Sequence, residues 1–118
     1  MPQIALDKIP PQNLEAEMAV LGSMLIDEAA ISVSIESLDA YSFYKDTHQK
    51  IFESISDLYN ANKAVDLITL TDELKRKDNL EGVGGVSFLT ALVNSVPTAA
   101  NINHYVNIVR EKSILRIS

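Results

Sequence analysis

The apolar residues between positions 13 and 27 repeat with the period of an α-helix and leave almost no polar face. One line recurs at steps of four, three and four residues: Leu14, Met18, Leu21 and Leu25. Further apolar lines, which include Val20 and Met24, cover most of the remaining circumference, and such a helix is buried on several sides. This segment predicts a central core helix that Asn13 caps. Gly22 lowers helix stability, so we expect another helix backbone to approach closely there.

Five further segments carry apolar residues at helical spacing on one face. These residues are Ile31, Ile35 and Leu38; Ile51, Phe52, Ile55, Leu58 and Tyr59; Leu70 and Leu74; Leu89, Leu92, Val93 and Val96; and Ile102, Tyr105, Val106 and Val109. No stretch alternates with a period of two. The predicted fold is therefore all-α, a compact bundle of about six helices in which the last helix is long and projecting.

Local signals predict the boundaries between these helices. The candidate caps are Asp27, Asp46 with Gln49 in a capping box, either Asp66 or Thr69, and Thr98.

The aromatic segment from Tyr41 to Tyr44 is expected to be a turn whose rings fill the core. The charged run at 72–78 is expected to be a solvated face. Residues 1–12, with their prolines and sparse apolar positions, predict an extended N-terminal arm, and residues 13–118 the helical domain.

The overall charge narrows the classes of partner. Sixteen acidic and ten basic residues give a formal net charge of -6. An acidic module of this kind is a poor non-specific binder of nucleic acid or of an anionic membrane. There is no cysteine, no signal peptide pattern and no run of about eighteen apolar residues that would span a membrane. A cytoplasmic protein is the expectation.

No catalytic, cofactor or metal site emerges from the candidate motifs. Gly82-Val83-Gly84-Gly85 is followed by no Lys-Ser or Lys-Thr pair and preceded by no strand, so a glycine corner between helices is favoured over a phosphate loop. His48 and His104 are far apart in sequence and the chain has no cysteine, which argues against a metal site. We expect His48 to be a partly buried structural histidine and His104 to be solvated. Glu15 and Glu17 point to different sides of a helix, which argues against an acid–base pair and favours stabilisation of the helix dipole. These observations favour a non-enzymatic interaction module.

The last helix has more apolar residues than one domain is expected to cover. One side, with Ile102, Tyr105, Val106 and Val109, can pack on the core. A second apolar set lies on other sides of the helix and is the candidate self-association surface: Ile108, Leu115, Ile114 and Ile117. The alternative is a frayed end created by truncation.

An ordered series of short motifs resembles the N-terminal domain of the bacterial replicative DNA helicase, the DnaB family. The matching residues are Ile9-Pro10-Pro11-Gln12, Glu15-Ala16-Glu17, Val20-Leu21-Gly22, Phe43-Tyr44, His48, Ile51-Phe52, Val65-Asp66-Leu67, Thr69, Gly84-Gly85, Val96-Pro97-Thr98-Ala99-Ala100-Asn101, Tyr105 and Ile108-Val109-Arg110-Glu111-Lys112. No single motif is diagnostic, but the series extends from about Ile9 to near the end of the chain. Met18 and Tyr41-Ser42 depart from the pattern without affecting capping or packing.

The resemblance implies a function that the periodicity does not show. Members of the family are ring-shaped hexamers that unwind DNA with ATP, and their N-terminal domains form a collar, often as a trimer of dimers. The collar binds primase and, in some bacteria, a helicase loader. ATP and magnesium would belong to a C-terminal motor domain that is absent here, and DNA would be bound only through the full-length ring. Glu15 and Phe88, an acid and an aromatic at helix positions, are the candidates for a primase or loader surface. The competing hypothesis is a free-standing acidic helical adaptor unrelated to replication.

Overall fold

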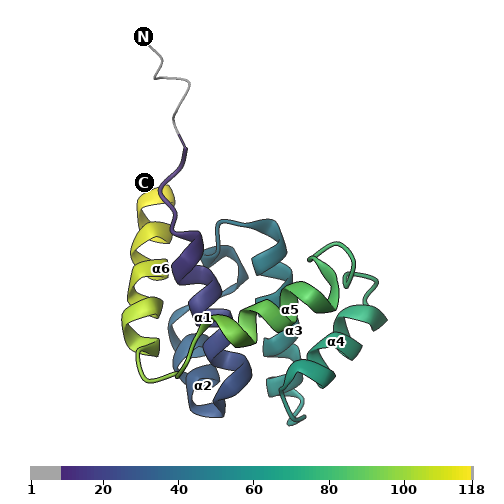
Figure 1. Cartoon of the computed structure of the whole chain (residues 1–118). Helices are drawn as coiled ribbons and strands as arrows, with labels where there is room; N and C mark the ends of the chain where they lie inside the picture. The colour runs from purple at the N-terminus through teal and green to yellow at the C-terminus, as the bar shows by residue number, and fades with distance from the viewer. Residues whose placement is uncertain (1–8, 118) are drawn as a thin grey trace.

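The computed structural model describes residues 9–117, and within them the chain forms six α-helices, one short 3-10 helix and no strand. The elements are α1 (Leu14–Ile26), α2 (Glu28–Ser37), the 3-10 helix η2 (Ala40–Ser42), α3 (Asp46–Asn60), α4 (Leu67–Arg76), α5 (Gly85–Ser95) and α6 (Ile102–Ile117). Figure 1 shows α6 running along one side of α1, with α3, α4 and α5 on the other side. The all-α prediction is confirmed. Most of the expected arm, residues 1–8, lies outside the described residues.

The helix α1 is the centre of the core, as its apolar circumference predicts. It contacts α2, α3, α5 and α6, and nine of its 13 residues are buried. Asn13 caps it, because its Oδ1 accepts a hydrogen bond of 2.9 Å from the N–H of Ala16. A Cβ on Gly22 would collide with the carbonyl oxygen of Leu92. The close approach expected at this glycine is therefore made by α5.

The surrounding helices bury the apolar faces that the sequence indicates. Asp27 caps α2 through a 2.9 Å bond from the N–H of Ala29. Asp66 caps α4, and Thr69 returns a hydrogen bond to the N–H of Asp66, so the two alternative caps form one capping box. The core side chains from α3, α4 and α5 are Ile51, Phe52, Ile55, Leu58, Leu70, Leu74, Leu89 and Leu92.

Only one ring of the aromatic segment before α3 enters the core. Phe43 is 1% exposed and packs against Phe52 with ring centroids 4.9 Å apart. Tyr41 is 82% exposed and Tyr44 lies at the surface, so the expectation that all these rings plug the core is wrong. The turn here is the 3-10 helix η2, with three residues per turn, which sends successive side chains to different sides.

One residue of the charged run on α4 is buried, which corrects the expectation of a fully solvated face. Glu73 follows Leu70 by three positions and therefore lies on the same, inward side of the helix. Its carboxylate accepts a 2.7 Å hydrogen bond from Nη2 of Arg76, and Nζ of Lys77 lies 3.5 Å away. The hydrogen bond from Arg76 holds the pKa of the Glu73 carboxyl below its usual value, against the opposing effect of burial.

The last helix begins later than Thr98, and the expected cap at that residue is wrong. Oγ1 of Thr98 accepts a 3.2 Å bond from the N–H of Ala100, which closes a local turn before the helix. Ala99 then enters the core, and α6 starts at Ile102. From there α6 buries the expected core face, with Val106 and Val109 each 2% exposed.

Candidate protein-interaction site

A buried carboxylate joins α1 to the beginning of α3. Glu17 is 1% exposed, and its Oε2 accepts a 2.7 Å hydrogen bond from the N–H of Tyr44. Its Oε1 lies 2.7 Å from Nδ1 of His48 and 3.4 Å from the backbone nitrogen of Lys45. Glu17 does stand in the first turn of α1, but its hydrogen bonds serve α3 rather than its own helix.

The cap that the sequence predicts for α3 is not formed. The N-cap residue, Lys45, makes no side-chain capping bond, and Asp46 already belongs to the helix. Gln49 donates instead to the carbonyl oxygen of Phe43 at 2.8 Å. The predicted Asp46–Gln49 capping box is therefore wrong, because the helix begins at Asp46 and the Gln49 side chain is used elsewhere.

His48 is the buried structural histidine that its place on the apolar face of α3 predicts. It is 1% exposed, so burial is more complete than expected. Nδ1 faces the Glu17 carboxylate, and Nε2 is buried without a hydrogen-bond partner. The imidazole stacks on the ring of Phe88 with centroids 6.1 Å apart. His104 lies exposed on α6, as predicted, and no group of residues in 9–117 has the composition of a metal site.

The two residues expected to contact primase or a loader lie in different surroundings. Phe88 is half-buried in the first turns of α5, where it partly covers His48. Glu15 is exposed on α1 and lines an open groove of about 480 Å³ between α1, α6 and the end of α5. Phe88 is not among the residues that line this groove. The structure thus places the two on separate features of the surface.

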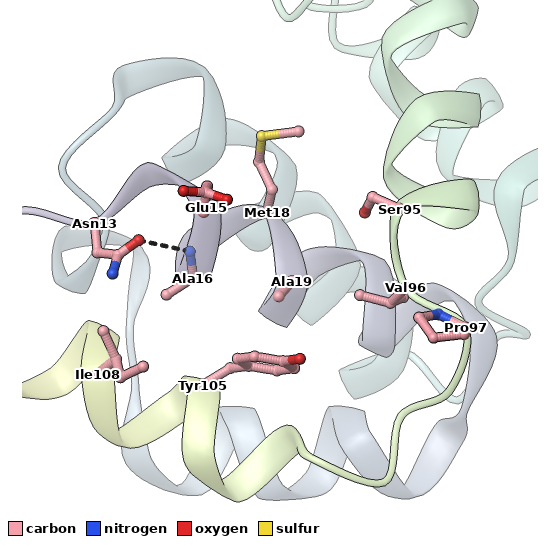
Figure 2. A pocket seen from close by; sticks show the side chains of 10 residues that line it. All are labelled: Asn13, Glu15, Ala16, Met18, Ala19, Ser95, Val96, Pro97, Tyr105 and Ile108. Carbon is pink, nitrogen blue, oxygen red and sulfur yellow. Dashed lines mark hydrogen bonds between the residues drawn. The ribbon is translucent and has the colours of Figure 1, made fainter.

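The α1–α6 groove combines an apolar floor with one acidic side chain. Figure 2 shows Ala16 and Ala19 of α1 facing Tyr105 and Ile108 of α6, with Val96 and Pro97 closing one end. Met18 and Glu15 stand on the α1 side. Sequence reasoning missed this groove because its walls come from three segments that only tertiary packing brings together.

The C-terminal part of α6 presents apolar side chains to solvent. We call Ile114, Leu115 and Ile117 the C-terminal apolar strip; they are 52%, 51% and 84% exposed. The fourth candidate, Ile108, is half-buried against the core and lines the groove. The structure therefore separates the predicted self-association set into three exposed residues and one groove residue.

Arg116 ties this end of α6 to two other segments of the chain. Its Nη1 donates to the carbonyl oxygen of Pro11 and its Nη2 to that of Ser42, both at 2.8 Å. Its guanidinium also lies over the ring of Tyr44, 5.6 Å from the centroid. These contacts dock the last turn of α6 on the segments around Pro11 and Ser42.

The glycine segment before α5 is a corner, as predicted. Gly84 and Gly85 have φ values of +114° and +70°, which L side chains rarely adopt, and a Cβ on Gly84 would press on Phe88. Gly84 is the N-cap of α5, and the loop before it makes turn hydrogen bonds rather than a strand.

None of the helices within residues 9–117 is long and apolar enough to span a membrane.

The chain is similar in structure and in sequence to known replicative helicases. A solved structure, the N-terminal domain of DnaB helicase from Mycobacterium tuberculosis, matches with a TM-score of 0.89 and 42% identity, over 92% of this chain and 78% of that one. The replicative DNA helicase DnaC of Bacillus subtilis (strain 168) is 49% identical over 98% of the chain, and the replicative DNA helicase DnaB of Geobacillus stearothermophilus is 46% identical over the same share.

These relatives are much longer than the present chain, which spans 26% of the length of each of the two helicases. The family model for the DnaB-like helicase N-terminal domain matches residues 9–111. This range includes the segments α1 to α5 and most of α6. The chain therefore belongs to the DnaB-like helicase N-terminal domain family.

Proposed function

We propose that this chain is a non-catalytic collar domain of a replicative DNA helicase, which assembles with copies of itself and offers a docking surface to primase and, in some bacteria, to a helicase loader. ATP and magnesium would be bound by a motor domain that this chain does not contain, and DNA only by the full-length hexameric ring. The family assignment argues against an adaptor unrelated to replication. Pull-down with the C-terminal domain of primase separates the two hypotheses.

The C-terminal apolar strip is the observation that supports self-association most directly. Three large apolar side chains, each more than half exposed, lie within four residues of one helix. Ile114 and Ile117, three residues apart, share one side of the helix, and exposed apolar surface on a small domain often marks a partner site, because its burial removes the area from water. A second copy offers the same strip, so the two can meet about a two-fold axis and cover each other.

The groove and Phe88 support partner docking as a separate role. The groove has an apolar floor with Glu15 at its side, a chemistry that suits an apolar peptide with a basic residue. Phe88 adds a half-exposed aromatic side chain elsewhere on the domain, and aromatic residues are enriched at the energetic centres of interfaces.

Sedimentation of the chain over a range of concentrations tests the assembly role. We expect concentration-dependent dimers for the wild type and folded monomers for the Leu115→Asp, Ile117→Asp double variant, because two charges in the strip would be buried without partners. Ile108 is left unchanged, since its half-buried position would make an aspartate there a test of folding instead.

The matched control is the Asn103→Asp, Asn107→Asp double variant. Both asparagines are exposed on α6 outside the strip, so the control adds the same charge to the same helix. It should dimerise like the wild type. A wild-type chain that stays monomeric at high concentration, or a strip variant that still dimerises, would contradict the assembly role of the strip.

A further inference from the structure

A second groove lies between the end of α2, the 3-10 helix η2 and α3, and it shares no lining residue with the α1–α6 groove. We call it the η2 groove, and the residues that define it are Ile35, Leu38, Asp39, Tyr41, Phe52 and Glu53. Its volume is about 370 Å³, near the lower end of the range of ligand pockets. The groove therefore has room for a few side chains rather than for a whole domain.

The floor of the η2 groove is apolar and belongs to the core. Leu38 and Phe52 are 6% and 3% exposed, and Ile35 is partly buried against the core. Tyr41 lines the same groove but is 82% exposed, so most of its ring is free to contact a bound chain. Aromatic residues are enriched at the energetic centres of interfaces.

The backbone that carries Tyr41 is fixed on both sides. Before it, Oδ1 of Asp39 accepts a 3.1 Å bond from the N–H of Ser42, and Oγ of Ser42 accepts a 3.0 Å bond from the N–H of Asp39. After it, Phe43 packs in the core against Phe52. A partner therefore finds this segment already ordered, which lowers the entropic cost of binding.

The charged side chains of the η2 groove are all acidic. Asp39 and Glu53 line it, and none of its lining residues is basic. Within residues 9–117 neither carboxylate has an ion-pair partner. Lys50, the lysine nearest to Glu53 in sequence, already pairs with Asp46 at 3.3 Å. An apolar floor beside two unpaired negative charges is complementary to apolar side chains that are flanked by positive ones.

We propose that the η2 groove is a docking site for a segment of a partner protein in which a few apolar residues are flanked by lysine or arginine. The apolar side chains pack on Leu38 and Phe52, the ring of Tyr41 covers them, and the basic side chains pair with Asp39 and Glu53. The net charge of -6 attracts such a segment to the chain. The site is separate from the α1–α6 groove and from Phe88, and it does not depend on the assembly role.

A synthetic helical peptide whose leucine stripe is flanked by lysines tests the groove directly. The same peptide with glutamates in place of the lysines is its control. In a titration followed by NMR of the labelled 118-residue chain, we expect the lysine peptide to shift the amide signals of residues 35–41 and 52–56. The glutamate peptide should bind there roughly tenfold more weakly. Shifts confined to other parts of the chain, or equal binding of the two peptides, would overturn the proposal.

Glu53→Lys and Glu15→Lys form a matched pair of variants, because both carboxylates are exposed and each lines a different groove. Affinity is read from the signals of residues 35–41 and 52–56 alone, so binding in the α1–α6 groove is followed separately. Glu53→Lys should weaken the lysine peptide by roughly fivefold, since an attraction becomes a repulsion, and Glu15→Lys should not. An equal loss in both variants would mean a general effect of charge and would contradict the site.

Tyr41→Ala tests the aromatic ring, and His104→Ala is its control, because both side chains are exposed. We expect roughly tenfold weaker binding of the lysine peptide by Tyr41→Ala and no change for His104→Ala. Circular dichroism confirms that each variant is folded. Wild-type affinity in Tyr41→Ala would refute the site. Groove signals that shift with the concentration of the chain alone would identify a second copy as the occupant and overturn the choice of a partner protein.

Discussion

At the scale of single residues, the carboxylate of Glu17 stabilises a helix other than its own. A carboxyl group is buried at low cost only where hydrogen-bond partners surround it, and here two backbone N–H groups and an imidazole nitrogen do so. The backbone donors belong to Tyr44 and Lys45, directly before α3, and would otherwise need water. One side chain thus holds the segment that leads into α3 and joins α1 to α3 through His48.

Glu17→Gln should lower the free energy of unfolding by roughly 1–3 kcal/mol, because the amide keeps the shape but offers one acceptor oxygen where the carboxylate offers two. Urea denaturation measures the difference. Glu15→Gln is the control: Glu15 is exposed on the same helix and should change stability by less than about 0.5 kcal/mol. Equal losses in the two variants would show that the buried bonds contribute nothing specific.

The ion pairs of Glu73 with Arg76 and Lys77 make a pH-dependent contribution to stability. Because the hydrogen bond from Arg76 lowers the pKa of the Glu73 carboxyl in the folded chain below its usual value, the native state favours the ionised form. This contribution is complete above the unfolded pKa and is lost as the pH falls through the lowered folded pKa. We therefore expect the stability advantage of wild type over Glu73→Gln to be full at neutral pH and to shrink in acid.

Denaturant unfolding of both proteins between neutral and acidic pH measures this advantage. Glu53→Gln is the control, since Glu53 is exposed on α3 and should show little pH-dependent difference from wild type. A Glu73→Gln difference that stays constant across the range would contradict the pKa shift.

At the scale of elements, the crossing of α1 and α5 depends on Gly22, which has no side chain. The carbonyl oxygen of Leu92 approaches Gly22 so closely that a Cβ would overlap it, and Val96 closes the same contact. A backbone atom cannot rotate away as a flexible side chain can. The glycine therefore sets how near α5 lies to α1, and the last residues of α5 in turn form one end of the α1–α6 groove.

Gly22→Ala should destabilise the chain by roughly 1–3 kcal/mol through overpacking, although alanine is the better helix former by about 1 kcal/mol. Gly82→Ala provides the control, because the nearest atom to a Cβ there is the carbonyl oxygen of Asn79 at an ordinary 3.6 Å. That variant should be neutral or slightly stabilised, by up to about 1 kcal/mol. Thermal unfolding that shows the same sign for both would mean that the crossing can relax.

At the scale of the whole molecule, the acidic balance limits what the isolated chain can bind. A net charge of -6 gives the chain little capacity to release counterions from duplex DNA. We expect no tight binding of a labelled duplex at physiological salt, measured by fluorescence anisotropy, and only a small change when the salt is lowered. Tight binding that weakens steeply with salt would reveal a concentrated basic surface.

The sequence by itself determined the helices and their inward faces. Periodicity placed Leu21, Ile55, Leu70 and Leu92 in the core, because a helix fixes which positions share a side. It also located the caps at Asn13 and Asp27 and narrowed the cap of α4 to Asp66 or Thr69, because such bonds are local. The ordered motifs were sufficient to recognise the family, which the matched relatives confirm.

Only the tertiary structure decided which groups meet across the fold. The segment that leads into α3 is held by Glu17, 28 residues before the bonded Lys45, and Arg116 of α6 bonds carbonyl groups 74 and 105 residues away in sequence. The α1–α6 groove likewise joins segments that no local pattern connects. Local periodicity fixes the side of a helix on which a residue lies, but a non-local hydrogen bond also requires the relative placement of two helices. That placement is set by the packing of the whole core, such as the contact at Gly22.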